Sequence, residues 1–187
     1  MNATETKIFW LPEADTGSII LASAPPLLST DSDVAKPLAV PDALITQDGA
    51  HHLHDLGNGQ RVHIVRSADI AGGEQLAALI PLGLDGFDRL EAVARLLASL
   101  HGRVVPPDTR LTRQQLARAR RMLRAADGAR DGATQQDIAE AIFRTGKLTR
   151  DEWQAASTRH AVMGLLRGAH AMIAGGYRKL LRHRRRP

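Results

Sequence analysis

Three helix-start signals of one kind divide the second half of this 187-residue sequence. In each signal a threonine is followed, three residues later, by a residue whose side chain can return a hydrogen bond. They are Thr112 with Gln115, Thr134 with Asp137, and Thr149 with Glu152. In such a capping box the two side chains satisfy backbone N–H groups that the first turn of a helix leaves unpaired. The three signals together predict a helical module with fixed helix starts.

Apolar residues recur at helical spacing after each signal. The first helix is expected to run from Thr112 to Ala126, and the second from Gln135 to Phe143. The third is expected over Arg150 to Ala174, with Gly175-Gly176 as its stop. The second and third helices fit a DNA-binding helix-turn-helix of the bent kind. In that motif the first helix braces the second, whose N-terminal turns enter the major groove.

Two groups of side chains are candidates for contact with DNA. Arginine can form a bidentate contact with guanine, and serine, threonine and histidine can bond to bases or phosphates. The expected base readers lie early in the third helix and are Ser157, Thr158, Arg159 and His160. The residues expected to hold phosphates are Arg144, Lys147, Arg150, Arg167, Arg178 and Lys179. The alternative is a plain helical bundle whose basic residues face solvent.

Charge is distributed unevenly along the chain. Residues 1–57 carry 2 Lys and Arg against 8 Asp and Glu, and residues 58–110 carry 6 of each kind. Residues 111–187 carry 17 against 6, a formal excess of +11. A basic half of this kind is typical of a protein that binds a polyanion, and it favours double-stranded DNA over a membrane surface. Aromatic residues make up only 3% of the chain, which disfavours stacking platforms for single strands or RNA.

The first 68 residues are predicted to be rich in β-structure. Short apolar runs bounded by proline and acidic residues indicate strands at Ile8-Phe9-Trp10, Ser18 to Ala22 and Leu44-Ile45-Thr46. A hairpin is expected from Leu53 to Val65, with Asn58-Gly59 in a type I′ turn. Its second strand should turn Val62 and Ile64 toward the core. Residues 24–43 contain four prolines and are expected to form a loop.

From Asp69 onward the apolar spacing becomes helical. One helix is expected from Asp69 to Ile80 and a second from Gly86 to Leu100. The apolar set of the second helix is Leu90, Val93, Leu97 and Leu100, whereas its solvated face is expected to carry Asp85, Asp88 and Glu91.

Pro106-Pro107 is a stiff break that separates a front module from a back module. The sequence therefore predicts an α+β fold in three parts. Residues 1–68 form a β-rich module with a hairpin, and residues 69–105 form connecting helices. Residues 106–187 form a helical DNA-binding domain with a basic tail.

Signals for catalysis are absent from the sequence. It contains no phosphate-cradling glycine loop and no GxSxG or HExxH motif, so we expect no enzyme activity and no cofactor. The candidate metal cluster is His51, His52 and His54, with His63 across the hairpin. Apart from Asp48 and Asp55, no cysteine or nearby carboxylate pair completes a site, so exposed hairpin histidines without a metal are the favoured interpretation.

The sequence also carries expectations about location and assembly. It has no Cys, no signal-peptide pattern at its start and no apolar run of the roughly 20 residues that span a bilayer. These features predict a soluble cytoplasmic protein, associated with the nucleoid and not with a membrane. Helix-turn-helix readers of palindromes are usually dimers, so a homo-oligomer is among the expected partners.

Several stretches of the second half carry a resemblance to a known family. They run from Asp127 to Ala139, through Trp153 and Ser157-Thr158-Arg159, to Gly175–Leu181. The chain resembles the family of the RovC-like type VI secretion transcription factor DNA-binding domain. The opening Ile8 to Glu13 and the region from Asp69 to Leu76 are similar to its upstream part.

The resemblance implies a bacterial DNA-binding or regulator-binding protein rather than an enzyme. Relatives in the family include FseA- and QseM-like regulators of conjugative mobile elements, of which the QseM-like members are antiactivators that bind other transcriptional regulators. One departure from the family pattern is Met163-Gly164, where basic residues are expected. It leaves Arg159 and Arg167 as the main cations of the long helix. Under the antiactivator hypothesis, a packing surface for a partner helix would be formed by Met163, Gly164 and Gly168.

Overall fold

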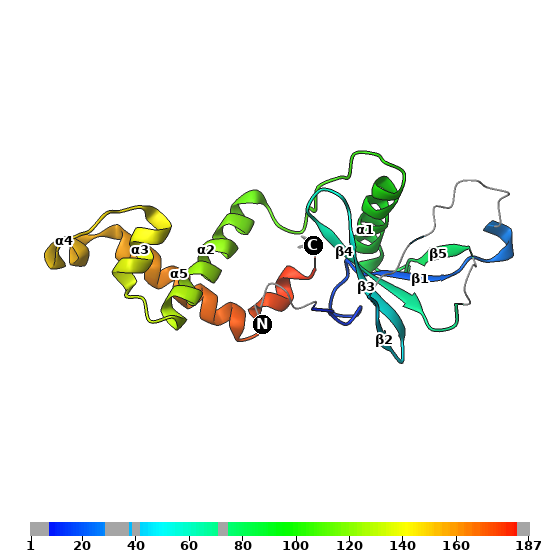
Figure 1. The fold of residues 1–187 in the computed structure, drawn as a ribbon, viewed down its shortest axis with the longest axis horizontal. Helices are drawn as coiled ribbons and strands as arrows, with labels where there is room; N and C mark the ends of the chain where they lie inside the picture. Colours follow the sequence, from blue (N-terminus) through cyan, green and yellow to red (C-terminus); the bar gives the residue numbers. More distant parts are fainter. Residues whose placement is uncertain (1–7, 29–37, 39–41, 71–74, 183–187) are drawn as a thin grey trace. The chain divides into compact units, whose positions relative to one another are not determined.

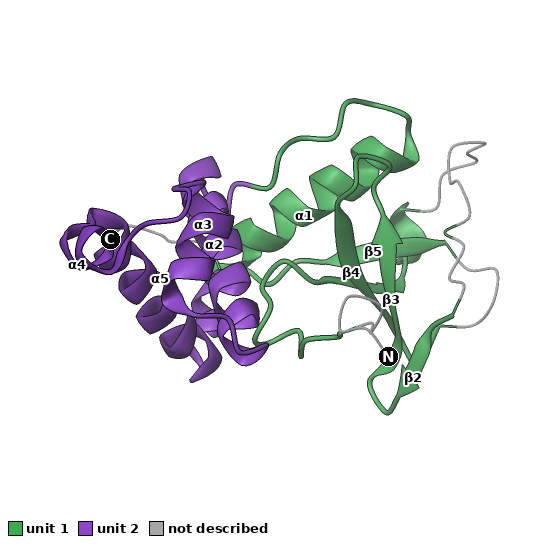
Figure 2. Cartoon of the chain, turned by 60° about the vertical axis from the view of Figure 1, so that its left-hand side comes forward, with its two compact units in different colours: residues 1–108, 181–187 green, residues 109–180 purple. Residues whose placement is uncertain are grey.

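The computed structural model describes residues 8–28, 38, 42–70 and 75–182. The chain divides into two compact units, shown in Figure 2. Unit 1 consists of residues 1–108 together with residues 181–187, and unit 2 of residues 109–180. A sheet followed by a helical region confirms the α+β fold.

Unit 1 is built on a five-stranded sheet with α1 (Asp85–Leu100) packed on one face (Figure 1). The strand order is β2-β3-β4-β1-β5. β1 runs parallel to β4, and the other neighbouring strands are antiparallel. A short 3-10 helix at Pro26–Leu28 follows β1. The strands are β1 (Ile19–Ser23), β2 (Leu44–Thr46), β3 (Gly49–Asp55), β4 (Arg61–Ser67) and β5 (Leu76–Leu79).

The core of unit 1 lies between the sheet and α1. Val62 and Ile64 are both buried, which confirms the predicted inward face of this strand. The pattern is not a simple alternation, because His63 and Val65 on the opposite face of β4 are buried as well. The cluster consists of Ile19, Leu21, Leu56, Val62, Ile64, Ala92 and Leu96.

The predicted hairpin is confirmed as β3 and β4, which pair from Gly49 with Ser67 to Asp55 with Arg61. Its type I′ turn is wrong. The positive φ angles lie at Gly57 (79°) and Gly59 (77°) and not at Asn58. The Asn58 side chain instead accepts a hydrogen bond from the Gln60 N–H at 3.0 Å. The strands are therefore joined by a longer loop, in which side chains hydrogen-bond to the backbone of the turn.

Two further expectations for unit 1 are wrong. The helix expected from Asp69 to Ile80 is replaced at its end by β5, which pairs antiparallel with β1 from Leu79 opposite Ile20 to Leu76 opposite Ser23; residues 71–74 lie outside the described residues. A four-residue apolar run fits either period, and pairing with a distant strand decides between them. The segment Ile8-Phe9-Trp10 is irregular, and the Phe9 ring packs edge-on against a histidine ring instead.

The helix predicted from Gly86 to Leu100 is confirmed as α1, but its inward face is different. Leu90 and Leu97 are 51% and 49% exposed, whereas Asp88, expected on the solvated face, is buried. Its carboxylate accepts a hydrogen bond from the Thr16 hydroxyl at 2.6 Å. Arg89 and Arg95 are also buried, and Arg89 donates to the Ser18 carbonyl. The apolar spacing predicts the wrong buried face of α1, because charged side chains of the helix are buried and hydrogen-bonded to the rest of unit 1.

Unit 2 is a bundle in which α2, α3 and α5 surround one core (Figure 1). All three predicted capping boxes are present with both reciprocal hydrogen bonds, which explains why the predicted starts are correct. The helices are α2 (Arg113–Arg130), α3 (Gln135–Phe143), α4 (Arg150–Ala155), α5 (Ser157–Ile173) and the 3-10 helix η2 (Gly176–Leu180). The core consists of Met122, Ala125, Ile138, Ala139, Val162, Leu165 and Ala169. No helix in the described parts of the chain is long and apolar enough to cross a membrane.

The single helix expected from Arg150 to Ala174 is wrong. The chain breaks at Ala156, which is extended with φ −71° and ψ 130°. In one straight helix, Trp153 and Val162 would lie nine residues and so about two and a half turns apart, on opposite sides. The break allows Trp153 to pack against the same core as the buried Val162.

Candidate nucleic-acid interface

The surface of unit 2 is strongly basic. Residues 109–180 contain 14 Lys and Arg against 6 Asp and Glu, an excess of +8. Of the 14 cations only Arg110 and Arg159 are half-buried, and the others are exposed. Arg130 is engaged by carboxylates, since its guanidinium lies 3.2 Å from Asp127 and 3.5 Å from Asp131. The basic excess of the sequence is therefore displayed on the outside of a folded helical unit.

The loop between α3 and α4, together with the first residue of α4, carries three of the predicted phosphate contacts. Arg144, Lys147 and Arg150 are all exposed there. The loop is tied to α3 because the Gln136 side chain donates to the Leu148 carbonyl at 2.6 Å. Arg144 caps the C-terminal end of α3 in the left-handed conformation, with φ 57° and ψ 42°, which is unusual for a residue other than glycine.

The charge of Lys147 in this loop acts on Asp137, a carboxylate at the start of α3. The pKa of Asp137 is lowered, mainly by the hydrogen bonds of its carboxylate with Thr134 and to a smaller extent by the nearby Lys147 charge. Asp137 is held by its own capping box, and Lys147 is exposed at the surface of the loop.

The four predicted base readers form the first turn of α5. Ser157 and His160 are exposed, and Arg159 is half-buried. The hydroxyl oxygen of Thr158 is buried and makes no hydrogen bond within the described residues. Thr158 lies four residues before the buried Val162, and therefore on the core-facing side of α5.

The N-terminus of α5 differs from those of α2, α3 and α4. Its N-cap residue is Ala156, which makes no side-chain capping hydrogen bond. The first N–H groups of a helix carry partial positive charge and readily bind an oxyanion such as phosphate. The N-terminus of α5 therefore lacks a side-chain cap, and it follows α4 and the cations that precede and begin α4.

The remaining phosphate candidates lie elsewhere on the unit. Arg178 and Lys179 belong to η2, which follows the C-terminal end of α5. α5 has 17 residues and is therefore about 25 Å long, so these cations are remote from the loop at residues 144–149. Arg167 is exposed on α5 between the two ends. The predicted cations thus form two separate groups with one residue between them.

An arginine row on α2 was missed as a candidate site. Arg113, Arg120 and Arg124 are exposed and recur at steps of seven and four residues, which places them on one face of a helix. The buried Met122 lies on the opposite face. The Arg124 guanidinium donates to the Ala141 carbonyl of α3 at 3.3 Å. The seven-and-four spacing is the sequence signal that could have identified this row.

The packing surface considered for a partner helix is partly used within unit 2. A Cβ atom on Gly168 would lie 2.6 Å from the sulfur of Met122 in α2, whereas one on Gly164 would meet nothing within 4 Å. Gly168 therefore serves contact between α5 and α2. Met163 is exposed, and Gly164 is half-buried.

The hairpin histidines are not exposed, so that expectation is wrong. His51, His52 and His63 are all buried. Nδ1 of His51 lies 3.1 Å from Nε2 of His63, whose Nδ1 lies 2.9 Å from the Ser18 hydroxyl. Burial lowers the pKa of His63 and of His52 to about 4, with neighbouring histidines contributing. Within the described residues no three His, Asp or Glu side chains are grouped to hold a metal ion.

Comparison with known families identifies the second half of the chain. The RovC DNA-binding domain model, described as a T6SS transcription factor DNA-binding domain, matches residues 79–182. The match begins at the end of β5 and includes α1 and all of unit 2. Comparisons with curated proteins and with solved structures found no match. The matched region covers more than half of the 187 residues.

Proposed function

The chain belongs to the family of T6SS transcription factor DNA-binding domains, and from this premise we propose that it is a bacterial transcriptional regulator that reads duplex DNA through α3 and α5 of unit 2. The observation that carries the proposal is the N-terminal end of α5. There α5 begins without a side-chain cap directly after the short helix α4. α4 begins with the exposed Arg150 and is preceded by a loop that carries the exposed Arg144 and Lys147. Such an end is suited to the negative charge of a phosphate backbone.

Base reading is assigned to the first turn of α5. α3 braces α5 through Ile138 and Ala139, which share a core with Val162 and Leu165, as the first helix of a helix-turn-helix braces the second. Arg159 is proposed to contact a guanine, with Ser157 and His160 bonding to neighbouring base edges. Thr158 is the weakest of the four candidates, because its hydroxyl is buried and it lies four residues before Val162 on the core-facing side of α5.

Phosphate binding is assigned to the two groups of cations. Arg144, Lys147 and Arg150 precede the reading turn, while Arg178 and Lys179 lie beyond the far end of α5, with Arg167 between them. Their separation, set by a helix about 25 Å long, approaches the roughly 34 Å of one turn of B-DNA. Contacts of this kind fix register and orientation on the duplex but carry no sequence information.

The test is binding to the DNA upstream of the protein's own gene, compared with scrambled DNA of equal length. Fluorescence anisotropy across a salt series would measure both affinity and salt slope. Arg159→Ala should reduce the preference for the upstream DNA more than it weakens binding. The double change Arg178→Ala, Lys179→Ala should weaken binding to both DNAs alike and reduce the slope by about 2, roughly 0.9 for each lost phosphate contact.

The matched control for this test is Arg130→Ala, because Arg130 is already engaged by Asp127 and Asp131. It should leave affinity and salt slope nearly unchanged. Equal, weak binding to both DNAs that disappears near physiological salt would contradict the base-reading assignment. Wild-type behaviour of both test variants would contradict the assignment of roles.

A second function, antiactivation by protein contact, is favoured by the surface at Met163 and Gly164. Both lie outside the core of α5, and Gly164 leaves open space where a partner side chain could enter. In this alternative the protein binds another transcriptional regulator and has no promoter of its own. Stoichiometric recovery of a transcriptional activator with the wild-type protein, and its loss with Gly164→Leu, would support this function in place of promoter binding.

A further inference from the structure

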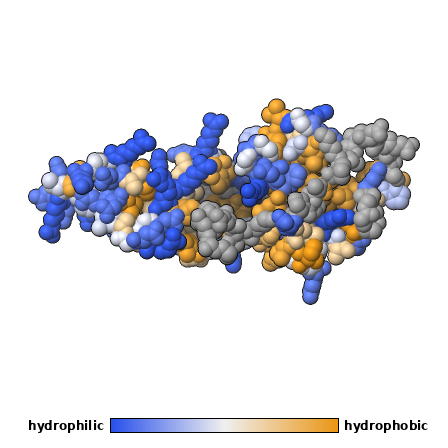
Figure 3. All heavy atoms as spheres, in the orientation of Figure 1, coloured by the Kyte–Doolittle hydropathy of each residue, from blue (hydrophilic) through white to orange (hydrophobic). Residues whose placement is uncertain are grey.

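α2 of unit 2 carries positive charge that no acidic residue of the same stretch balances. Residues 113–126 contain five arginines and no aspartate or glutamate. Three of these arginines, Arg113, Arg120 and Arg124, form the exposed arginine row, and none of the three forms an ion pair with another described residue. Figure 3 shows mostly hydrophilic surface over the helices of unit 2. The row is therefore free to bind an anion from outside the chain.

The spacing of the arginines costs stability in the free protein. Arg120 and Arg124 lie four residues apart, and like charges at this spacing destabilise a helix. Arg121 lies three residues before Arg124 and is a second neighbour of the same charge on the helix surface. A bound anion would relieve this repulsion, so the row is better suited to a bound polyanion than to water alone.

One hydrogen bond joins the arginine row to the cations after α3. The Arg124 guanidinium donates to the Ala141 carbonyl of α3 at 3.3 Å, and a guanidinium has further N–H groups that can bind an anion. Ala141 lies three residues before Arg144, which is about 4.5 Å along the helix axis. Arg144 caps α3, and the exposed Lys147 follows in the loop. The row and the loop cations therefore meet at the C-terminal end of α3.

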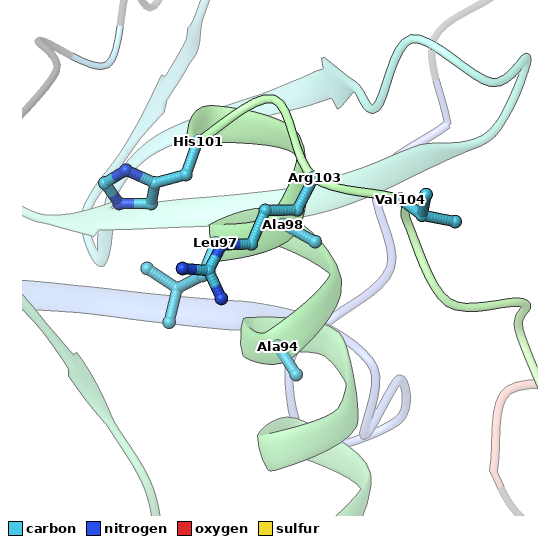
Figure 4. Close-up of a pocket in the computed structure, with 6 residues that line it drawn as sticks. All are labelled: Ala94, Leu97, Ala98, His101, Arg103 and Val104. Atoms are coloured by element: carbon cyan, nitrogen blue, oxygen red, sulfur yellow. The ribbon is translucent and has the colours of Figure 1, made fainter.

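Unit 1 offers a polyanion much less. Its shallow groove along the C-terminal half of α1 is lined by Ala94, Leu97, Ala98, His101, Arg103 and Val104 (Figure 4). Arg103 is the only permanent cation of this set, and Figure 4 shows its side chain alongside Leu97. Because the groove is mainly apolar, the polyanion site is assigned to unit 2.

We propose that the arginine row of α2 binds the phosphate backbone of duplex DNA, independently of sequence, as an extension of the loop cations. Arg113 and Arg124 are eleven residues apart and so lie about 16 Å apart along the helix axis. One strand of B-DNA carries about five phosphates over that length, at roughly 3.4 Å each. The three guanidinium groups can therefore each contact a separate phosphate. Duplex DNA as the ligand rests on the proposed function, but base reading by α5 is not required.

A membrane surface fits α2 less well. A helix that binds a membrane buries its apolar face among the lipids. On α2 that face carries Met122 and Ala125, which are buried in the core of unit 2 instead. Binding to a DNA backbone needs exposed cations and no apolar face, and the arginine row supplies these cations.

The test is the salt dependence of binding to scrambled duplex DNA, measured with the full chain by fluorescence anisotropy. The row variant combines Arg113→Gln, Arg120→Gln and Arg124→Gln, because Gln has a helix propensity close to that of Arg. It should lower the salt slope by about 2.7, roughly 0.9 for each lost phosphate contact. Between about 50 and 200 mM salt the wild type should therefore lose about 40-fold more affinity than the row variant. Each single change should lower the slope by about 0.9.

The matched control removes three positive charges outside the row, with Arg61→Gln, Arg103→Gln and Arg130→Gln. Arg61 and Arg103 are exposed in unit 1, and Arg130 is engaged by Asp127 and Asp131. The control has the same net charge as the row variant, so it separates a local contact from the charge of the whole chain. It should keep the wild-type slope. Circular dichroism checks that both variants keep their helices.

Three results would overturn the proposal. They are a row variant that keeps the wild-type slope, a control that loses as much slope as the row variant, and a row variant that loses binding to phosphatidylserine vesicles while its DNA binding is unchanged. The last result would assign the row to a membrane surface. A wild type without preference for the upstream DNA, but with a slope that depends on the row, would contradict only base reading by α5, so the two proposals can fail separately.

Discussion

Arg144 at the end of α3 allows stability and DNA binding to be moved in opposite directions by one change. Its φ of 57° and ψ of 42° lie in the left-handed region, which costs a residue other than glycine about 1–2 kcal/mol. Glycine removes this cost but gains about 0.4–1 kcal/mol of conformational freedom in the unfolded chain. The Arg144 side chain is exposed, so little packing is lost. Arg144→Gly should therefore stabilise unit 2 by roughly 0.5–1 kcal/mol.

The same change should weaken DNA binding. If Arg144 holds a phosphate, its loss lowers the salt slope by about 0.9 and reduces affinity for all sequences alike. Arg144→Ala is the matched control, because it loses the cation and keeps the left-handed backbone. It should bind DNA as weakly as Arg144→Gly while gaining no stability.

Urea unfolding followed by Trp153 fluorescence measures the stability of unit 2, since Trp153 packs against its core; the fluorescence of Trp10 is subtracted with a Trp10→Phe background. Anisotropy with the upstream DNA measures binding. Arg144→Gly that unfolds at lower urea than Arg144→Ala would refute the account of backbone strain. Unchanged affinity in both variants would refute the phosphate assignment and leave the strain account intact.

Two further predictions concern the cores of the two units. The pKa of His63 and of His52 is lowered to about 4, so the unfolded chain, with pKa near 6.5, binds more protons than the folded one as pH falls. The stability of unit 1 should be complete above pH 6.5 and decline toward pH 4, by roughly 3 kcal/mol for each of the two histidines. Urea midpoints followed by Trp10 fluorescence should fall between pH 7 and pH 5, and His63→Gln should reduce this fall by about half. A flat wild-type profile would contradict the assignment. In unit 2, Gly168→Ala should cost about 1–3 kcal/mol by overpacking, because its Cβ would lie 2.6 Å from the Met122 sulfur. Gly164→Ala is the control, because a Cβ atom at Gly164, about one turn earlier in α5, would meet nothing within 4 Å. It should leave the thermal unfolding temperature unchanged or raise it.

Local signals account for the parts of the fold that the sequence predicts well. Each capping box acts over four residues, and all three helix starts in unit 2 follow from them. The hairpin is similarly local, and its two glycines supply the positive φ angles even though the turn is not the expected one. The charge excess of unit 2 is a property of composition, so its exposure on the folded surface is also foreseeable.

The errors arise where distant segments decide the outcome. Leu76 to Leu79 become a strand because β1 offers an edge to pair with, which no local period reveals. Asp88 and Arg89 turn inward because Thr16 and the Ser18 carbonyl meet them there. The break at Ala156 follows from the packing of Trp153 against residues of other helices. For the candidate interface, the sequence predicts that Ser157 to His160 begin a helix turn, but it does not predict the burial of the Thr158 hydroxyl.

The return of the chain to unit 1 makes unit 2 an insertion rather than a tail. Two covalent crossings, after Asp108 and before Leu181, join the units. Within unit 1 the Leu181 carbonyl oxygen lies 3.4 Å from the Thr16 hydroxyl, and Arg182 donates to the Glu13 carbonyl at 2.5 Å. During synthesis, unit 1 therefore lacks its last pieces until all of unit 2 has left the ribosome. A proteolytic cut near Pro107 would leave unit 2 attached to unit 1 through Leu181. A premature stop codon after unit 2 would instead remove Leu181 and Arg182, and with them their contacts to Thr16 and Glu13 of the sheet domain.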